Sequence, residues 1–413
     1  MGLEMATGTV RAARRARSRR TGWVAPLLLA LGPSVIGLCA DNDAGGMLSY
    51  LVSGASHGLS WLLPALLFLG LPTVFVMWVA MRVAEATRLP YSRVLTARVG
   101  APLARLEAIA LYGLNGVILV TEFVGMTLAL SLAGLPRPLS VSLTFGLVVV
   151  LTNAGTYARI EQLLLRVALG NLVFVPALLF VHHPSGALVA AFTAHVPNRW
   201  FLLLALAGNT LAPWMVYWQQ NAVCAGDRRT SGQRMADLVA GQVAMVVMAC
   251  TVLLLGALTP GAVGAGGSPV AWVFHAGGRA AGILFAVGLF DAGLLAACTI
   301  SLASLWMLRE ATARTQEVPL AAPNQGGWRV LHVGTLAVAA AVVLWPHLSA
   351  GALALWAQAV GGLWLPVTLV LLGLVASSRR IMGHMAIGPA ARVGLALMAA
   401  GYLVLACLGI LAV

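Results

Sequence analysis

The sequence predicts an all-helical integral membrane protein with eleven membrane-spanning helices, of which the first and the sixth are broken. Three observations support this fold class. The 413-residue chain is 60% hydrophobic and only 9% charged, whereas a soluble protein carries about 25% charged residues. Apolar segments long enough to cross a bilayer recur along the whole chain. Two of these segments are interrupted by polar residues, glycine or proline.

A spanning helix needs about 20 mostly apolar residues. By this criterion the predicted segments are 23–55 (interrupted), 61–86, 106–133, 138–153, 159–181, 200–224 (interrupted), 235–258, 280–308, 329–346, 352–376 and 392–412. Residues 1–22 form a basic arm ahead of the first segment. The arm and the first apolar run together resemble a signal peptide. The next apolar run begins almost at once, however, so we interpret the first run as a spanning helix.

The arginines predict how the chain is oriented in the membrane. All 25 basic residues are arginines, and 22 of them lie in the arm and in alternate gaps between segments. The other gaps hold only Arg137, Arg199 and Arg279. Basic loops face the cytoplasm and its anionic lipids. The N-terminus is therefore predicted inside the plasma (inner) membrane and the C-terminus outside. The net charge of +13 does not indicate nucleic-acid binding, because no surface of mixed aromatic and basic residues accompanies it.

The interruption of the first segment carries two carboxylates, Asp41 and Asp43, beside Asn42 and two glycines. One carboxylate at the centre of a spanning helix costs at least ~2.5–3.5 kcal/mol. Glycines loosen the helix, so backbone carbonyls and side chains become available as ligands. The pattern predicts a cation site with Asp43 as a direct ligand. The alternative is that Asp43 caps a helix at the break, bonded by Thr210 or by backbone amides. For Asp41 and for Asn42, contact with the ion or its water shell is as well supported as no contact.

The second interruption runs from Gly208 to Trp214 and contains Asn209 and Pro213. Proline removes a backbone donor and clashes with the preceding turn, and Gly208 tolerates non-helical angles. This break lies five segments after the first. Two broken helices in matching positions are typical of an inverted-repeat transporter that binds its substrate between them. The predicted repeats span about 23–181 and 200–376, and an extra helix follows at 392–412.

Several motifs resemble those of the NRAMP divalent-metal transporter family. They are Gly32-Pro33, Asp43 to Gly46, Gly54 to Ser60, Glu122-Phe123-Val124-Gly125, and the run from Gln358 through Leu365-Pro366 to Ser378 to Gly383. The similarity extends from about residue 24 onward. It implies a LeuT-type fold of five plus five helices. It also implies a monomer whose substrate is a divalent metal ion and which holds no cofactor.

The chain departs from the family pattern where the metal would bind. Ala212 stands where typical members have a methionine whose sulfur binds the metal, and Gly46 stands where they have an asparagine. Trp214 and Gln219 replace two histidines of the sixth helix. Leu119 replaces an aspartate on the usual proton route. These changes remove the soft and borderline ligands together.

The donors that remain carry oxygen, which hard ions such as Mg²⁺ prefer. They are Asp41, Asn42, Asp43, Asn209, Gln219 and Gln220, and the resemblance adds Gln358, which lies opposite the sixth-helix break in family members. We expect the small residues Gly46 and Ala212 to leave room for a hydrated ion. The pattern resembles the NRAMP-related magnesium transporters. It predicts uptake of Mg²⁺, and of Mn²⁺, without proton coupling.

Other interpretations stay open from the sequence. A conventional proton-coupled Mn²⁺/Fe²⁺ importer is the nearest, with Glu122 or Asp291 taking over the coupling. Glu122 is otherwise a structural acid between helices. Asp291 is otherwise a second cation or gate site, or the partner of an interhelical hydrogen bond. Trp214 packs the bundle or lines a gate. A metal sensor and an amino-acid symporter fit less well, and no catalytic motif indicates an enzyme.

Overall fold

The computed structural model describes most of the chain. The described residues are 31–57, 59–155, 157–181, 186–193, 198–224, 229–259, 268–313 and 326–412. The predicted basic arm, 1–22, and the start of the first predicted segment lie outside them. Every regular element in these ranges is a helix, as the composition predicts.

The first half of the described chain begins at α3, which is split from α4 by two residues. Its helices are α3 (Pro33–Asp41), α4 (Ala44–His57), α5 (Leu62–Thr87), α6 (Tyr91–Val99), α7 (Ala101–Ser131), α8 (Arg137–Thr152), α9 (Tyr157–Gly170), η1 (Asn171–Val173), α10 (Phe174–Leu179) and α11 (Ala187–Thr193). The helix α6 and the short α11 are not among the predicted spanning segments.

The second half begins at α12, which is split from α13 by four residues. Its helices are α12 (Arg199–Gly208), α13 (Pro213–Cys224), α14 (Ser231–Ala257), α15 (Pro269–Thr312), α16 (Gly326–Val342), α17 (Ala350–Ala376), α18 (Arg379–Met382), η2 (Gly383–Met385) and α19 (Pro389–Leu411). The helix α15 extends beyond its predicted segment at both ends. It kinks at Gly278, whose φ of 68° is left-handed.

Eight stretches of helix in the described residues are long and apolar enough to cross a membrane, and α8 and α16 are shorter apolar helices. The predicted number of eleven crossings stays a prediction. Large apolar side chains face outward, such as Leu71, 70% exposed, and Leu179, 81% exposed. An exposed apolar surface of this kind suits lipid rather than water.

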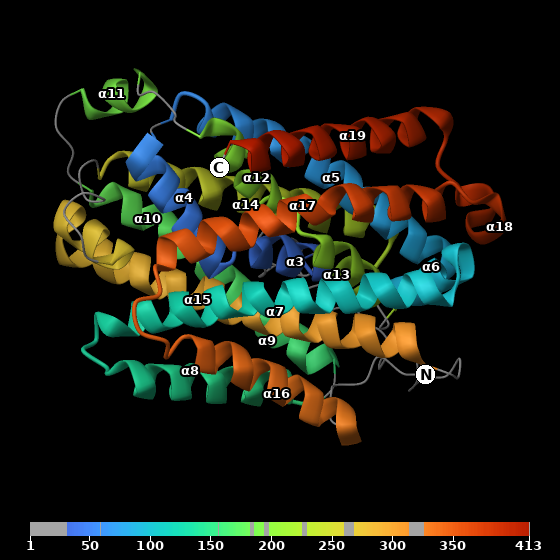
Figure 1. Ribbon diagram of the computed structural model, residues 1–413, viewed down its shortest axis with the longest axis horizontal. Helices are drawn as coiled ribbons and strands as arrows, with labels where there is room; N and C mark the ends of the chain where they lie inside the picture. Colours follow the sequence, from blue (N-terminus) through green and yellow to red (C-terminus); the bar gives the residue numbers. More distant parts are fainter. Residues whose placement is uncertain are drawn as a thin grey trace, which may run out of the picture.

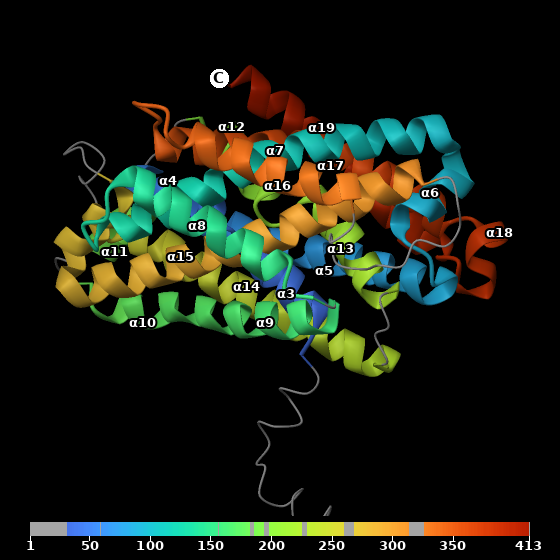
Figure 2. The ribbon, with the colours of Figure 1, turned by 90° about the horizontal axis from the view of Figure 1, so that it is seen from below.

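The bundle encloses the two split helices. Figures 1 and 2 show α3 and α13 in the interior, surrounded by the longer helices. The helix α7 packs along α15, α14 packs against α3 and α4, and α12 packs against α17 and α19. Glycines permit the closest approach. A Cβ on Gly256 would lie 2.1 Å from the Leu51 carbonyl oxygen, and one on Gly54 the same distance from that of Leu253. Small residues at such contacts are typical of membrane helices.

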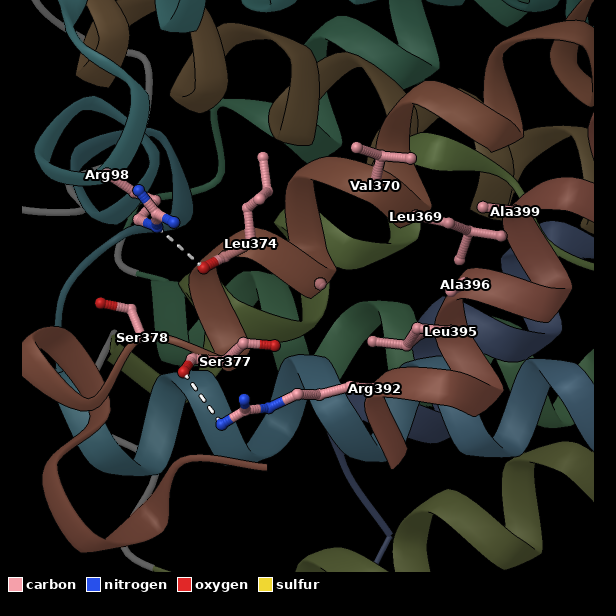
Figure 3. Close-up of a pocket in the computed structure, with 11 residues that line it drawn as sticks. Arg98, Leu369, Val370, Leu374, Ser377, Ser378, Arg392, Leu395, Ala396 and Ala399 are labelled. Carbon is pink, nitrogen blue, oxygen red and sulfur yellow. Dashed lines mark hydrogen bonds between the residues drawn. The ribbon is translucent and has the colours of Figure 1, made fainter. Parts of the chain in front are cut away.

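A pocket of about 430 Å³ lies where α6, α17 and α19 meet (Figure 3). Two arginines in its lining bond to carbonyl groups at the end of α17. Arg98 donates to Leu374 at 3.0 Å, and Arg392 donates to Ser377 at 3.4 Å. None of the predicted site residues lines this pocket.

Candidate metal-ion site

The first break lies at Asn42 and Asp43, between the end of α3 and the start of α4. Asn42 has a non-helical ψ of 56°. Asp41, Asn42 and Asp43 are at most 3% exposed. The sequence therefore places its two acids where a helix is interrupted in the buried interior of the bundle.

Asp43 caps the helix that follows it. Its Oδ1 accepts the N–H of Gly46, the third residue of α4, which is the usual bond of an N-cap aspartate. The side-chain amide of Gln358, from α17, donates to both carboxylate oxygens at 2.9 and 3.1 Å. Thr210 takes no part, because its hydroxyl donates to the Ala207 carbonyl. Asp43 is therefore bonded by a backbone amide and not by Thr210.

Glu122 reaches the same helix end from α7. Its Oε2 accepts the N–H of Ala44 at 2.8 Å, and its Oε1 accepts the Thr121 hydroxyl at 2.9 Å. Gly125, one turn later, lets α4 approach, since a Cβ there would lie 2.3 Å from the Ala44 Cβ. Glu122 thus has a structural role at α4, and a coupling role stays a prediction.

The second break meets the first. Asn209 donates from its side-chain amide to the Ser49 hydroxyl at 3.3 Å, and its carbonyl accepts the Tyr50 hydroxyl at 3.1 Å. The second break therefore supplies polar groups that bond to α4, the helix that follows the first break.

The room expected beside Gly46 is already filled. A Cβ on Gly46 would lie 1.9 Å from the Asn209 Oδ1. The amide of Asn209 thus occupies the space that a larger residue at position 46 would need. This corrects the expectation that Gly46 leaves space for a hydrated ion.

A sulfur atom that the sequence analysis missed lies at the second break. The Met215 Sδ accepts the backbone N–H of Ala212 at 3.3 Å. The expectation that Ala212 removes the thioether from the break is therefore corrected, because the residue one turn later returns it. Helical spacing from Ala212 was the signal that could have found it.

Three buried oxygen atoms near the breaks have no hydrogen-bond partner: Asp41 Oδ2, Asn42 Oδ1 and Asn209 Oδ1. The amide nitrogen of Asn42 is engaged, donating to the Met245 carbonyl at 2.7 Å. In the described residues, no three His, Cys, Asp or Glu side chains gather closely enough to hold a metal. Amide oxygens or the thioether would have to complete the coordination of an ion here.

The remaining predicted residues lie apart from this group. Gln219 donates to the Ser34 hydroxyl at 3.0 Å, near the start of α3, and Gln220 donates to the Leu89 carbonyl at 2.9 Å, after α5. Trp214 is buried at the start of α13. Asp291 packs its carboxylate against Gly170 and lines an apolar pocket of about 500 Å³ on α7 and α15.

Comparison with known proteins gives a family and a fold. The family model of Nramp, described as natural resistance-associated macrophage protein-like, matches residues 35–412. The manganese transporter of Eremococcus coleocola, in complex with an aromatic bis-isothiourea substituted compound, superimposes with a TM-score of 0.72 at 18% identity. The match covers 95% of this chain and 87% of that one.

More distant structures share the fold. Mhp1, a nucleobase-cation-symport-1 family transporter in a closed conformation, matches with a TM-score of 0.60 at 13% identity, over 92% of this chain and 90% of its own. A Na⁺-coupled sialic acid symporter matches with a TM-score of 0.54 at 12% identity, over 94% and 95%. No curated protein sequence matches the chain.

The two roles of Asp43 can be separated by substitution. Asp43→Asn keeps an oxygen for the Gly46 N–H, so the ion-free protein should unfold near the wild-type temperature. Asp43→Ala should lose about 1 kcal/mol of capping energy. Divalent ion at one hundred times its Kd should stabilise the wild type by about 2.7 kcal/mol and should stabilise neither variant. Thermal unfolding in detergent, with and without ion, measures both effects. A full ion-induced shift in Asp43→Asn would contradict a ligand role.

Proposed function

Since this chain belongs to the Nramp family, we propose that it carries a divalent metal ion across a membrane by alternating access. The ion is Mg²⁺ first and Mn²⁺ second, and its uptake is not coupled to protons. The proposal rests on the three buried, unpartnered oxygen atoms of Asp41, Asn42 and Asn209. Oxygen ligands are those that Mg²⁺ prefers and that also suit Mn²⁺. The fold shared with a manganese transporter supports Mn²⁺ as the second ion.

The proposed architecture follows the sequence prediction. The chain crosses the membrane eleven times, with repeats at about 23–181 and 200–376 and an extra helix at 392–412. The N-terminus lies in the cytoplasm, the C-terminus lies outside, and the protein is a monomer. A negative-inside potential contributes ~2.3 kcal/mol per charge per 100 mV. A dication gains twice this amount, so the potential alone drives uptake.

Two observations favour a proton-coupled Mn²⁺ or Fe²⁺ importer as the second candidate. The Met215 sulfur lies at the second break, and thioethers prefer softer ions to Mg²⁺. Glu122 and Asp43 both bond to the start of α4, so a cation that binds Asp43 would arrive beside a second carboxyl group, a kind of group that carries protons in membrane transporters. Oxygen donors nevertheless outnumber the single sulfur at the breaks, and this favours the first candidate.

The buried site needs a helix movement to open, and α3 is held at the end nearest the proposed cytoplasmic side. Asp237, from α14, accepts the backbone N–H groups of Gly32 at 2.6 Å, Ser34 at 2.9 Å and Val35 at 3.3 Å. A carboxylate on the first N–H groups of a helix is a strong cap. Releasing it would free α3, which carries Asp41 at its other end.

Side chains of α13 add to this hold on α3. The Trp218 indole donates to the Pro33 carbonyl at 2.9 Å and stacks on Trp306, with ring centroids 5.7 Å apart. Gln219 bonds to Ser34 beside it. We therefore assign Gln219 to the closure of α3 rather than to the water shell of the ion.

Transport itself is tested in proteoliposomes loaded with an ion dye and an internal pH dye. We expect Mg²⁺ and Mn²⁺ to enter without acidification of the interior, and Asp43→Ala to abolish entry of both. Asp43→Ala removes a charged ligand, and the neutral amide oxygens that remain bind a cation too weakly to replace it. Mn²⁺ entry with acidification and without Mg²⁺ transport would establish the second candidate instead.

The thioether is tested by Met215→Leu, which nearly conserves volume and costs little packing energy. If oxygen atoms coordinate the ion, uptake of Mg²⁺ and Mn²⁺ should both stay within about twofold of wild type, since a neutral neighbour contributes well under 1 kcal/mol. The ratio of Mn²⁺ to Mg²⁺ uptake is the measured quantity. A tenfold fall in Mn²⁺ uptake alone would identify the sulfur as a ligand.

The closure of α3 is tested with two native cysteines. Cys39, two residues before Asp41, is 2% exposed, and Cys298 in α15 is fully buried. Asp237→Asn should weaken the cap by about 1.4 kcal/mol and raise maleimide labelling of Cys39 about tenfold. Peptide mapping by mass spectrometry measures both sites, and Cys298 should stay unlabelled. Unchanged Cys39 labelling, or equal labelling of both cysteines, would contradict a specific release of α3.

A further inference from the structure

The pocket drawn in Figure 3 lies apart from the proposed ion site, between the end of α6, the end of α17 and the first turns of α19. Figure 1 places α6 and α18 at the same end of the bundle. In the proposed orientation this end faces the cytoplasm. Two of the residues that line the pocket are arginines and none is acidic, so the pocket carries a positive charge.

The polar side chains gather at one end of the pocket. Figure 3 shows Ser377 and Ser378, at the end of α17, between the side chains of Arg98 and Arg392. Both arginines are exposed. Two guanidinium groups and two hydroxyl groups therefore face the same opening.

The two arginines retain donors that the protein does not use. Arg98 bonds through its Nε to one carbonyl, and Arg392 bonds through its Nε and Nη2 to two. A guanidinium group carries five N–H donors, so capping of the last carbonyls of α17 engages only a minority of them. Within the described residues neither arginine has an acidic partner, unlike Arg93, which pairs with Glu310 at 2.6 Å.

The other end of the pocket is apolar. Figure 3 shows Leu369 and Ala399 away from the two guanidinium groups. Leu369 precedes Ser377 by eight residues, which is about 12 Å along α17. Val370 in this part of the lining is 51% exposed, and exposed apolar side chains of this kind suit lipid. The lining thus changes from charged to apolar along the length of one helix.

We propose that this pocket binds an anionic phospholipid of the cytoplasmic leaflet. Its phosphate lies between Arg98 and Arg392, and one acyl chain follows the groove between α17 and α19. Arginine binds phosphate oxygens through paired N–H donors, and basic pockets between membrane helices at the cytoplasmic face bind anionic headgroups. A free phosphate ion has no group to fill the apolar part of the pocket. The leaflet follows from the proposed orientation, whereas the binding chemistry does not depend on the transported ion.

The test measures lipid binding to the full-length protein in a neutral detergent by native mass spectrometry. The ligands are dioleoyl phosphatidylglycerol, dioleoyl phosphatidylcholine and inorganic phosphate. Wild type should bind one phosphatidylglycerol at least tenfold more tightly than phosphatidylcholine, because only the first lipid carries a net negative charge. Arg98→Gln combined with Arg392→Gln should bring the two affinities within about twofold of each other.

Two further variants distinguish this pocket from general surface charge and from loss of folding. Arg159→Gln combined with Arg329→Gln removes the same charge from exposed arginines near the starts of α9 and α16, and it should keep the wild-type preference. Ala396→Phe fills the apolar part of the pocket and leaves both pocket arginines in place. It should weaken binding of both lipids about tenfold.

The outcomes bear on this pocket alone. Equal affinity of wild type for the two lipids would overturn the inference, and so would an unchanged preference in the variant that lacks both pocket arginines. Displacement of phosphatidylglycerol by millimolar inorganic phosphate would show a site for a free anion and would overturn the assignment to a phospholipid. None of these results changes the expected uptake of Mg²⁺ or Mn²⁺, so failure here leaves the proposed function to its own tests.

Discussion

Carboxylates at the beginnings of helices hold this structure together. A helix leaves its first N–H groups unpaired, and inside an apolar bundle no water pairs them. Asp43 and Glu122 bond to the start of α4, and Asp237 bonds to the start of α3. Each acid thus obtains a partner from the backbone. Backbone donors help to make these buried acids tolerable, and Asp237 also lies near an arginine, with the Arg229 Nη1 3.8 Å from its Oδ2.

The same bonds link binding to conformation. Under the proposed function, a cation at the breaks would compete with backbone N–H groups for the carboxylates, and its arrival would alter what holds α4 in place. The helix α3 joins the proposed ion site to the proposed gate, because Asp41 is its last residue and Asp237 caps its first turn. Movement of α3 therefore changes the surroundings of the ion directly. Alternating access needs a coupling of this kind between site and gate.

The helix ends lie close to the interruptions seen in the sequence, but several side chains contact other groups than those expected. Helices end at Asp41 and Gly208, as the polar and glycine-rich interruptions predicted. Gln358, taken from the family resemblance, does reach Asp43. Gln219 does not, because helical rotation along α13 turns it towards α3. Met215 was overlooked because methionine is common in apolar helices. Its contact with the Ala212 N–H is what places its sulfur at the second break.

The sequence by itself determined the membrane class, the helical content and the two places where helices break. These depend on hydropathy, on charge and on the local preferences of glycine and proline, which act over a few residues. Tertiary structure alone decided which buried oxygen atoms are left without partners and which groups share a site. Asn209 fills the space beside Gly46, and Gln358 reaches Asp43. Such contacts join residues about one hundred or more positions apart, and only packing in three dimensions fixes them.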